Sequence, residues 1–147
     1  MKKYVFFLVL FFLLIAFFVF KFFYNAPDLG GPHVRIGSAL FSVEMADTEQ
    51  QRERGLGNRD ALCDTCGMLF LFDSSGKYAF WMKDMRFPLD ILWIRDGKIV
   101  HIERNVDFRN QYKVYHSEQP ADRVLEVNAG ICTQWGIQEG DMVAFEQ

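Results

Sequence analysis

The first two dozen residues constrain this chain most, because they contain an apolar run long enough to cross a bilayer. The run from Tyr4 to Phe20 has no charged residue, and Lys21 is the only charge between it and Tyr24. At the helical rise per residue, the stretch from Tyr4 to Tyr24 reaches roughly 31 Å, about the thickness of a bilayer's hydrocarbon core. We therefore expect residues 1–24 to form a transmembrane helix that contacts the lipid bilayer through residues 4–24.

The flanks of this run favour an uncleaved anchor over a cleaved signal peptide, which is the open alternative. A signal peptide has a shorter apolar region and small residues at its cleavage site, whereas Phe22, Phe23 and Tyr24 are bulky. Lys2 and Lys3 precede the run, and positive charge tends to remain on the cytoplasmic side. The sequence thus predicts a single-pass protein of the cell membrane, with a cytoplasmic N-terminus and an extracytoplasmic domain.

The charge of the remaining chain argues against a nucleic-acid partner. Residues 1–24 include three lysines and no acid, so residues 25–147 carry 13 Lys and Arg against 19 Asp and Glu. A net charge of about −6 is far from the basic surface that nucleic-acid binding requires. This part is long enough for one domain with its own core, and too short for two ordinary ones.

The exported part begins with a linker. Residues 25–32 are rich in Gly and Pro, which disfavour both helix and sheet, and residues 33–147 then form the predicted domain. Asp47 or Thr48 can cap a short helix over 49–54.

Short apolar runs bounded by turn residues predict strands through the rest of the domain. They are Met68–Phe72, Tyr78–Met82, Leu89–Ile94, Val124–Val127 and Met142–Phe145. The pair Asp96-Gly97 indicates a tight hairpin between 89–95 and 98–103. We expect a mainly β fold, a single antiparallel β-sandwich or barrel with one or two short helices.

The cysteines indicate a structural disulfide. Cys63 and Cys66 form a Cys-x-x-Cys and Cys132 stands alone, so the bond could join the pair or link one of them to Cys132. A redox role is less favoured, because the reactive motif follows a strand at a helix N-terminus, whereas this pair lies between a polar turn and a strand. There is no second close ligand pair for zinc, and we expect no metal or cofactor.

Two acidic residues lie inside apolar strands. Asp90 is flanked by Leu89 and Ile91, and Glu126 by Leu125 and Val127. Such a carboxyl either points to water, or is buried and needs a partner or a shifted pKa. Three interpretations of the pair remain: a structural ion pair or backbone clamp, a pocket that faces a ligand, and a catalytic pair.

The run Phe80-Trp81-Met82-Lys83 is the third feature. In a strand Trp81 and Lys83 share one face, and an exposed Trp beside a cation could form a shallow binding surface. The alternative is that other segments cover this face and the aromatic residues belong to the core.

Several short motifs occur in an order that is specific as a set. They are Arg54-Gly55-Leu56, Gly67-Met68-Leu69-Phe70-x-Phe72, Phe80-Trp81-Met82-Lys83, Pro88-Leu89-Asp90-Ile91, Val124-Leu125-Glu126-Val127 with Ala129-Gly130, and Gly140-Asp141. From about Phe41 to Phe145 the chain resembles the uncharacterised family called domain of unknown function 192. The resemblance implies a compact, jelly-roll-like β domain, often exported or membrane-anchored, and no activity.

The chain departs from this family at Asp84-Met85, where members often have Asn-Thr, which removes a hydroxyl and adds an acid. The Cys-x-x-Cys is not general to the family.

The leading functional hypothesis is a tethered extracytoplasmic binding or accessory module. Trp81, Lys83, Asp90 and Glu126 would hold a small polar ligand or a chain end. One alternative is a hydrolase or lyase that uses the Asp90 and Glu126 carboxyls. Another is a structural partner of an envelope protein. The sequence has no catalytic triad order, nucleophile elbow or phosphate loop, so it favours binding over catalysis.

Overall fold

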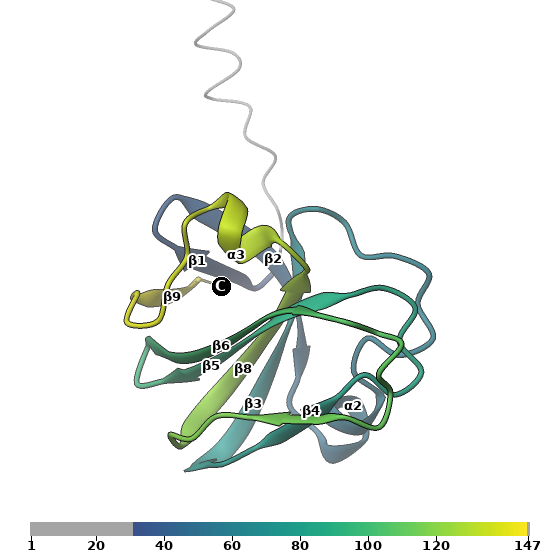
Figure 1. Cartoon of the computed structure of the whole chain (residues 1–147). Helices are drawn as coiled ribbons and strands as arrows, with labels where there is room; N and C mark the ends of the chain where they lie inside the picture. Colours follow the sequence, from purple (N-terminus) through teal and green to yellow (C-terminus); the bar gives the residue numbers. More distant parts are fainter. Residues whose placement is uncertain (1–30, 147) are drawn as a thin grey trace, which may run out of the picture. The chain divides into compact units, whose positions relative to one another are not determined.

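The computed structural model describes residues 31–146, in which nine β-strands far outnumber two short helices (Figure 1). The strands are β1 (His33–Ile36), β2 (Ala39–Ala46), β3 (Cys66–Gly76), β4 (Ala79–Trp81), β5 (Leu89–Arg95), β6 (Lys98–Val106), β7 (Val114–His116), β8 (Ala121–Asn128) and β9 (Val143–Glu146), and the helices are α2 (Glu49–Arg54) and α3 (Ile131–Gln134). The predicted anchor over 1–24 lies outside these residues, as does nearly all of the linker. Within 31–146, no helix has the length and apolar character needed to cross a membrane.

Seven of the strands form one curled sheet in the order β6-β5-β8-β3-β2-β1-β9, and β4 pairs with β7 in a second, two-stranded sheet. The mainly β class with two short helices is confirmed. The large sheet is a curled half-barrel rather than a closed barrel or two stacked sheets (Figure 1).

The expectation of a wholly antiparallel sheet is wrong at one pair of strands. β2 and β3 run parallel, with Ser42 opposite Cys66 and Ala46 opposite Phe70. Parallel neighbours need a long crossover between them, and residues 47–65, which contain α2, supply it. This crossover places α2 and the loop after it beside the sheet.

The hairpin between β5 and β6 is confirmed. Arg95 lies opposite Lys98, and the two residues between them have positive φ, +51° at Asp96 and +70° at Gly97. A two-residue type I′ turn requires this conformation at both central positions, which is why the Asp-Gly pair predicts it.

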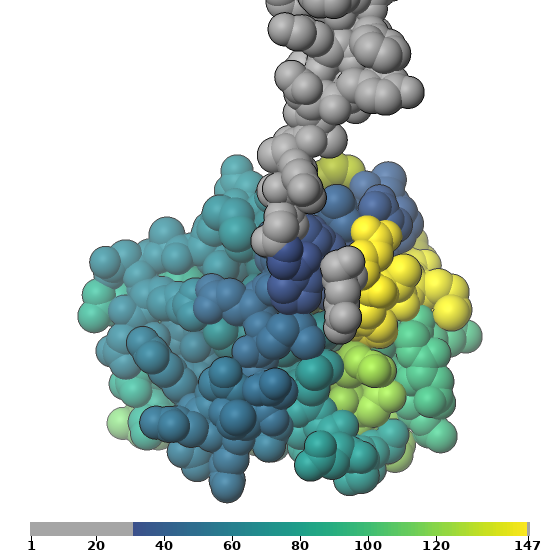
Figure 2. Space-filling model, turned by 180° about the vertical axis from the view of Figure 1, so that it is seen from behind, coloured from purple at the N-terminus to yellow at the C-terminus, as the bar shows by residue number. Residues whose placement is uncertain are grey.

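The curl of the sheet brings its two edge strands into contact at one end only, where β6 begins and the chain enters β9. Val143 N donates to the carbonyl of Gly97 at 2.8 Å, and Ile99 N donates to the carbonyl of Asp141 at 3.0 Å. A single bridge pairs Lys98 with Met142. Within the sheet, β9 is the last strand and pairs with β1. The space-filling view shows this C-terminal strand beside the N-terminal ones (Figure 2).

The large sheet has an apolar core on each face. The first core includes Val34, Phe41, Leu92, Leu125, Ile131 and Ile137, and the second includes Met68, Phe70, Phe80, Met82, Ile91, Trp93 and Val124. Every residue from Leu89 to Ile94 is buried, and alternate residues of β5 enter alternate cores. A polar residue in the middle of β5 or β8 is therefore enclosed on whichever face it points to.

The short helix α2 begins at a capping box. Thr48 Oγ1 accepts from Gln51 N at 3.3 Å, and Thr48 N donates to Gln51 Oε1 at 2.9 Å. Of the two predicted caps, Thr48 is the one that is used. Gly55 ends the helix with φ +48°, a conformation that glycine adopts at low cost. The segment Gly55–Gly57 follows the helix and lines the cavity described below.

Candidate functional site

Glu126 is the polar residue that enters the second core. It lies on β8 two residues after Val124, so the two side chains share a face, and its neighbours across the sheet are Met68 on β3 and Ile91 on β5. The side chain is only 4% exposed. The sheet thus places a carboxyl group between apolar neighbours.

Beside this carboxyl lies a cavity of about 220 Å³. Its apolar wall comes from β3, β4 and the segments next to them, and its charged rim comes from α2 and from Lys83. The lining residues are Glu49, Arg52, Glu53, Arg54, Gly55, Leu56, Gly57, Phe70, Phe72, Tyr78, Ala79, Phe80, Trp81, Lys83, Met85 and Glu126. Glu126 is the most buried of the charged residues among them.

The Glu126 carboxyl has no partner of its own among residues 31–146. Burial raises its pKa to about 8, and no ion pair or hydrogen bond counteracts this. Arg52 lines the same cavity, but its guanidinium donates to the carbonyls of Asp47 (2.8 Å) and Leu71 (2.9 Å) and lies over the Phe72 ring. At neutral pH Glu126 is therefore mainly a neutral carboxylic acid that faces a cavity.

Three of the four predicted ligand residues come together at this cavity. Trp81, on β4, is 52% exposed, and Lys83 follows two residues later; both line the cavity with Glu126. Their role in binding a ligand remains a prediction.

The fourth, Asp90, lies on the opposite face of the sheet. It is fully buried, with Oδ1 accepting from Asn105 N at 2.7 Å and Oδ2 from Cys132 N at 2.9 Å. These bonds join β5 to a kinked residue of β6, where Asn105 has φ +52°, and to the first turn of α3. This geometry matches the backbone-clamp interpretation.

The two carboxyl groups therefore do not share a cleft. Asp90 pairs in register with Val127 and Glu126 with Ile91, so their side chains leave opposite faces of the sheet. A glycosidase-type mechanism needs both carboxyls on either side of one bound substrate. Asp90 and Glu126 therefore cannot act as the two carboxyls of such a mechanism.

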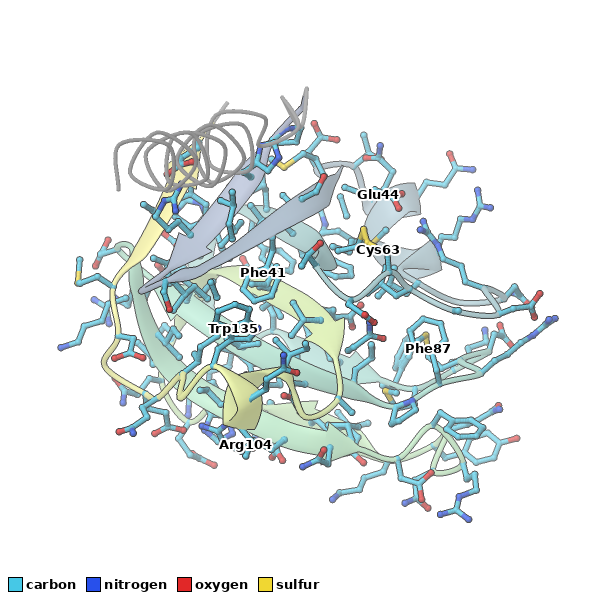
Figure 3. All side chains as sticks on the ribbon, turned by 90° about the horizontal axis from the view of Figure 1, so that it is seen from above. Phe41, Glu44, Cys63, Phe87, Arg104 and Trp135 are labelled. Carbon is cyan, nitrogen blue, oxygen red and sulfur yellow. A yellow bond between two sulfur atoms is a disulfide. The ribbon has the colours of Figure 1, made fainter. Side chains whose placement is uncertain are left out.

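The cysteines divide into a pair and a buried single thiol. The Sγ atoms of Cys63 and Cys66 lie at disulfide-bonding distance, visible as a yellow bond at Cys63 (Figure 3). Asn128 Nδ2 donates to the carbonyls of Leu62 and Cys63, both at 3.0 Å, and so holds this loop against the end of β8. Cys132 is fully buried, and burial together with Asp90 raises its pKa to about 12, so it is a neutral thiol.

Sequence reasoning missed most of the cavity wall. Phe70 and the segment Gly55–Gly57 line it, yet neither is polar enough to stand out as a binding residue. A signal was present, since four of the short motifs that carry the family resemblance contribute lining residues. Within 31–146, no three His, Cys, Asp or Glu residues are placed to hold a metal ion.

Comparison with known proteins gives a family and a fold. The model of the DUF192 family, described as "Uncharacterized ACR", matches residues 33–145. No curated protein matches the chain.

Two solved structures are similar to it. A protein of Sinorhizobium meliloti 1021, provisionally described as a transcription regulator, is 33% identical with a TM-score of 0.72; the match covers 78% of this chain and 91% of that one. A protein of unknown function from Novosphingobium aromaticivorans DSM 12444 is 30% identical with a TM-score of 0.72, over 80% and 89% of the two chains.

The clamp formed by Asp90 predicts a large loss of stability when its carboxyl is removed. Asp90→Ala leaves the buried N–H of Cys132 and the part-buried N–H of Asn105 without acceptors, so we expect the free energy of unfolding to fall by about 2–4 kcal/mol. Asp90→Asn keeps one acceptor oxygen and should lose less. Urea unfolding of the detergent-solubilised chain measures both, with the exposed Asp73→Ala as the control. Equal stability of Asp90→Ala and Asp73→Ala would show that the clamp contributes nothing.

The raised pKa of Glu126 predicts a specific dependence of stability on pH. The folded protein holds this proton up to pH of about 8, whereas the unfolded chain releases it near 4.5, so the contribution is complete below pH 4.5 and is lost as pH rises to 8. We expect Glu126→Gln to gain roughly 3–5 kcal/mol over the wild type between pH 4.5 and pH 8.5. Urea unfolding of both proteins across this range tests it. A difference that stays constant with pH would mean that Glu126 ionises as freely in the folded state as in water.

Proposed function

This chain belongs to the DUF192 family, and we propose that it is a membrane-tethered extracytoplasmic module that binds a small ligand in the cavity beside Glu126. The observation that carries this proposal is a buried carboxyl that has no partner among residues 31–146 and faces a cavity whose rim reaches solvent through Trp81 and Lys83.

The chemistry of the cavity supports binding. An unpartnered polar group in an apolar setting lowers stability, so a purely structural role gives no reason to keep Glu126 there. Ligand sites combine mostly apolar walls with a few polar groups that fix orientation. Phe70, Phe80 and Leu56 supply such walls here, and Glu126 supplies the polar group.

The tether rests on the sequence of the first two dozen residues. An apolar run of bilayer length follows Lys2 and Lys3, which favours a cytoplasmic N-terminus and an exported domain. The bonded Cys63 and Cys66 fit an exported domain, because disulfides persist in oxidising compartments.

A second candidate function is docking to another envelope protein. Trp81 on β4 pairs with Val114 on β7, and the two are 52% and 50% exposed, which makes a small apolar patch on the two-stranded sheet. Val114 is not part of the cavity lining. Val114→Ala would therefore weaken docking and leave binding in the cavity unchanged, whereas Trp81→Ala would affect both.

The tether predicts that the chain fractionates with membranes and that its C-terminus lies outside. In spheroplasts of cells expressing the chain with a tag at each end, added protease should remove the C-terminal tag and leave the N-terminal one intact. Carbonate washing should leave the protein in the pellet. A tag released into the soluble lysate, or a C-terminal tag that is protected, would contradict the proposed topology.

The binding site predicts a ligand-dependent rise in Tm. We would screen the detergent-solubilised full chain against sugars, amino acids, amines and metal ions. A ligand at about 100 times its Kd should raise Tm by roughly 5–15 °C. Trp81→Ala and Glu126→Gln should lose this rise, whereas the control Trp135→Ala, half-exposed and outside the cavity, should keep it. A flat screen, or a rise that both cavity variants keep, would reject the site.

A further inference from the structure

We infer that the ligand of this cavity is a small organic cation, a primary ammonium compound whose nitrogen pairs with the Glu126 carboxylate while its apolar part packs on the aromatic wall. This inference rests on the proposed function and adds the class of ligand to it.

The Glu126 carboxyl lacks a positively charged partner within residues 31–146. Glu126 is 4% exposed and lines the cavity, and no described residue gives its carboxyl a positive charge or a hydrogen bond. A buried carboxylate is stable only with a charged or hydrogen-bonding partner. An ammonium group supplies both, with one positive charge and three N–H donors.

Aromatic rings form much of the wall of the cavity. Phe70 and Phe80 meet edge to face, with ring centroids 4.9 Å apart, and Phe72 and Tyr78 stack beside them. All four rings line the cavity. Phe72 already stacks on Tyr78 and has the Arg52 guanidinium 5.3 Å from its ring centroid, so Phe70 and Phe80 are the rings left to contact the ligand. Their rings offer an apolar surface to its hydrocarbon part.

The rim contains charges of both signs. From α2 and its end come Glu49, Glu53, Arg52 and Arg54, and Lys83 follows β4. Arg52 is held on backbone carbonyls, and Arg54 and Lys83 are exposed. Within residues 31–146 none of these cations forms an ion pair with the Glu126 carboxyl, whose pKa is raised by burial. The alternative, an anionic ligand held by Arg54 and Lys83, would leave Glu126 protonated.

The size of the cavity limits the cation. About 220 Å³ is below the ~300–1,000 Å³ of ordinary small-molecule sites. An ammonium group with a short alkyl chain suits a space of this size.

Binding of such a cation is coupled to loss of one proton. Below pH 8 the free site holds Glu126 as a carboxylic acid. When the ammonium ion enters, the carboxyl gives its proton to the buffer, and the carboxylate formed pairs with the cation. Affinity should therefore fall about tenfold for each pH unit below the pKa of the free site.

The experiment compares three probes of matched size with the detergent-solubilised full chain: n-butylammonium, 1-butanol and butyrate. Isothermal titration calorimetry at pH 6 and pH 8, in two buffers with different ionisation enthalpies, gives the affinity and the number of protons released. We expect n-butylammonium to bind more tightly than the other two, at least tenfold more tightly at pH 8 than at pH 6, and with proton release at pH 6.

Glu126→Gln is the decisive variant. This variant should lower the affinity for n-butylammonium by about 30-fold or more and should remove the pH dependence of that affinity. Glu103→Gln, which removes the same charge outside the cavity, should behave as the wild type. Because Glu126→Gln removes a buried ionisable group, it is expected to fold, and its Tm checks this.

The remaining outcomes separate the two proposals. Suppose that 1-butanol or butyrate binds as tightly as n-butylammonium, and that Trp81→Ala weakens this binding. The cavity is then a binding site, but the inferred cationic class of ligand is wrong. If n-butylammonium binds equally well to Glu126→Gln, the pairing is wrong. If no probe binds but a ligand of another class raises Tm in the screen above, only the inference falls. If neither occurs, both proposals fall.

Discussion

Burial on both faces of the central strands is the constraint on which this structure depends. β5 and β8 lie next to each other within the large sheet and contribute to a core on each side, so neither strand has a solvated face. Each of these strands carries one enclosed acid, and the two acids meet different surroundings. Asp90 is satisfied by two backbone N–H groups and holds α3 and β6 in place. Glu126 has apolar neighbours and a cavity. The same local pattern, an acid inside an apolar strand, thus yields a structural residue in one case and a candidate binding residue in the other.

Features set by neighbouring residues could be predicted from the sequence. The β5–β6 hairpin follows from Asp96-Gly97, and the start of α2 follows from Thr48 with Gln51, because these turns and caps form within four residues. Side-chain alternation also shows that Trp81 and Lys83 share a face. The parallel pairing of β2 with β3 could not be predicted, because it depends on how the crossover over 47–65 packs against the sheet.

The candidate site shows the same division. Sequence patterns identify Asp90 and Glu126 as unusual, but the face to which each points depends on the register of three strands that are distant in sequence. The apolar wall was harder still to identify, since Phe70 and Phe80 are ordinary core residues until a cavity opens beside them. These residues form a candidate site because one carboxyl has no partner among residues 31–146, and that is visible only in three dimensions.

The crossover between β2 and β3 separates two roles within one small domain. Most of the charged rim of the cavity belongs to α2 and its end, in a segment that is not a strand of either sheet, whereas Glu126 and part of the apolar wall stand on hydrogen-bonded strands. Segments outside a sheet tolerate replacement far better than the strands they connect. Relatives could therefore diversify what they recognise by exchanging this crossover alone, and a protein engineer could graft new ones onto the unchanged sheet.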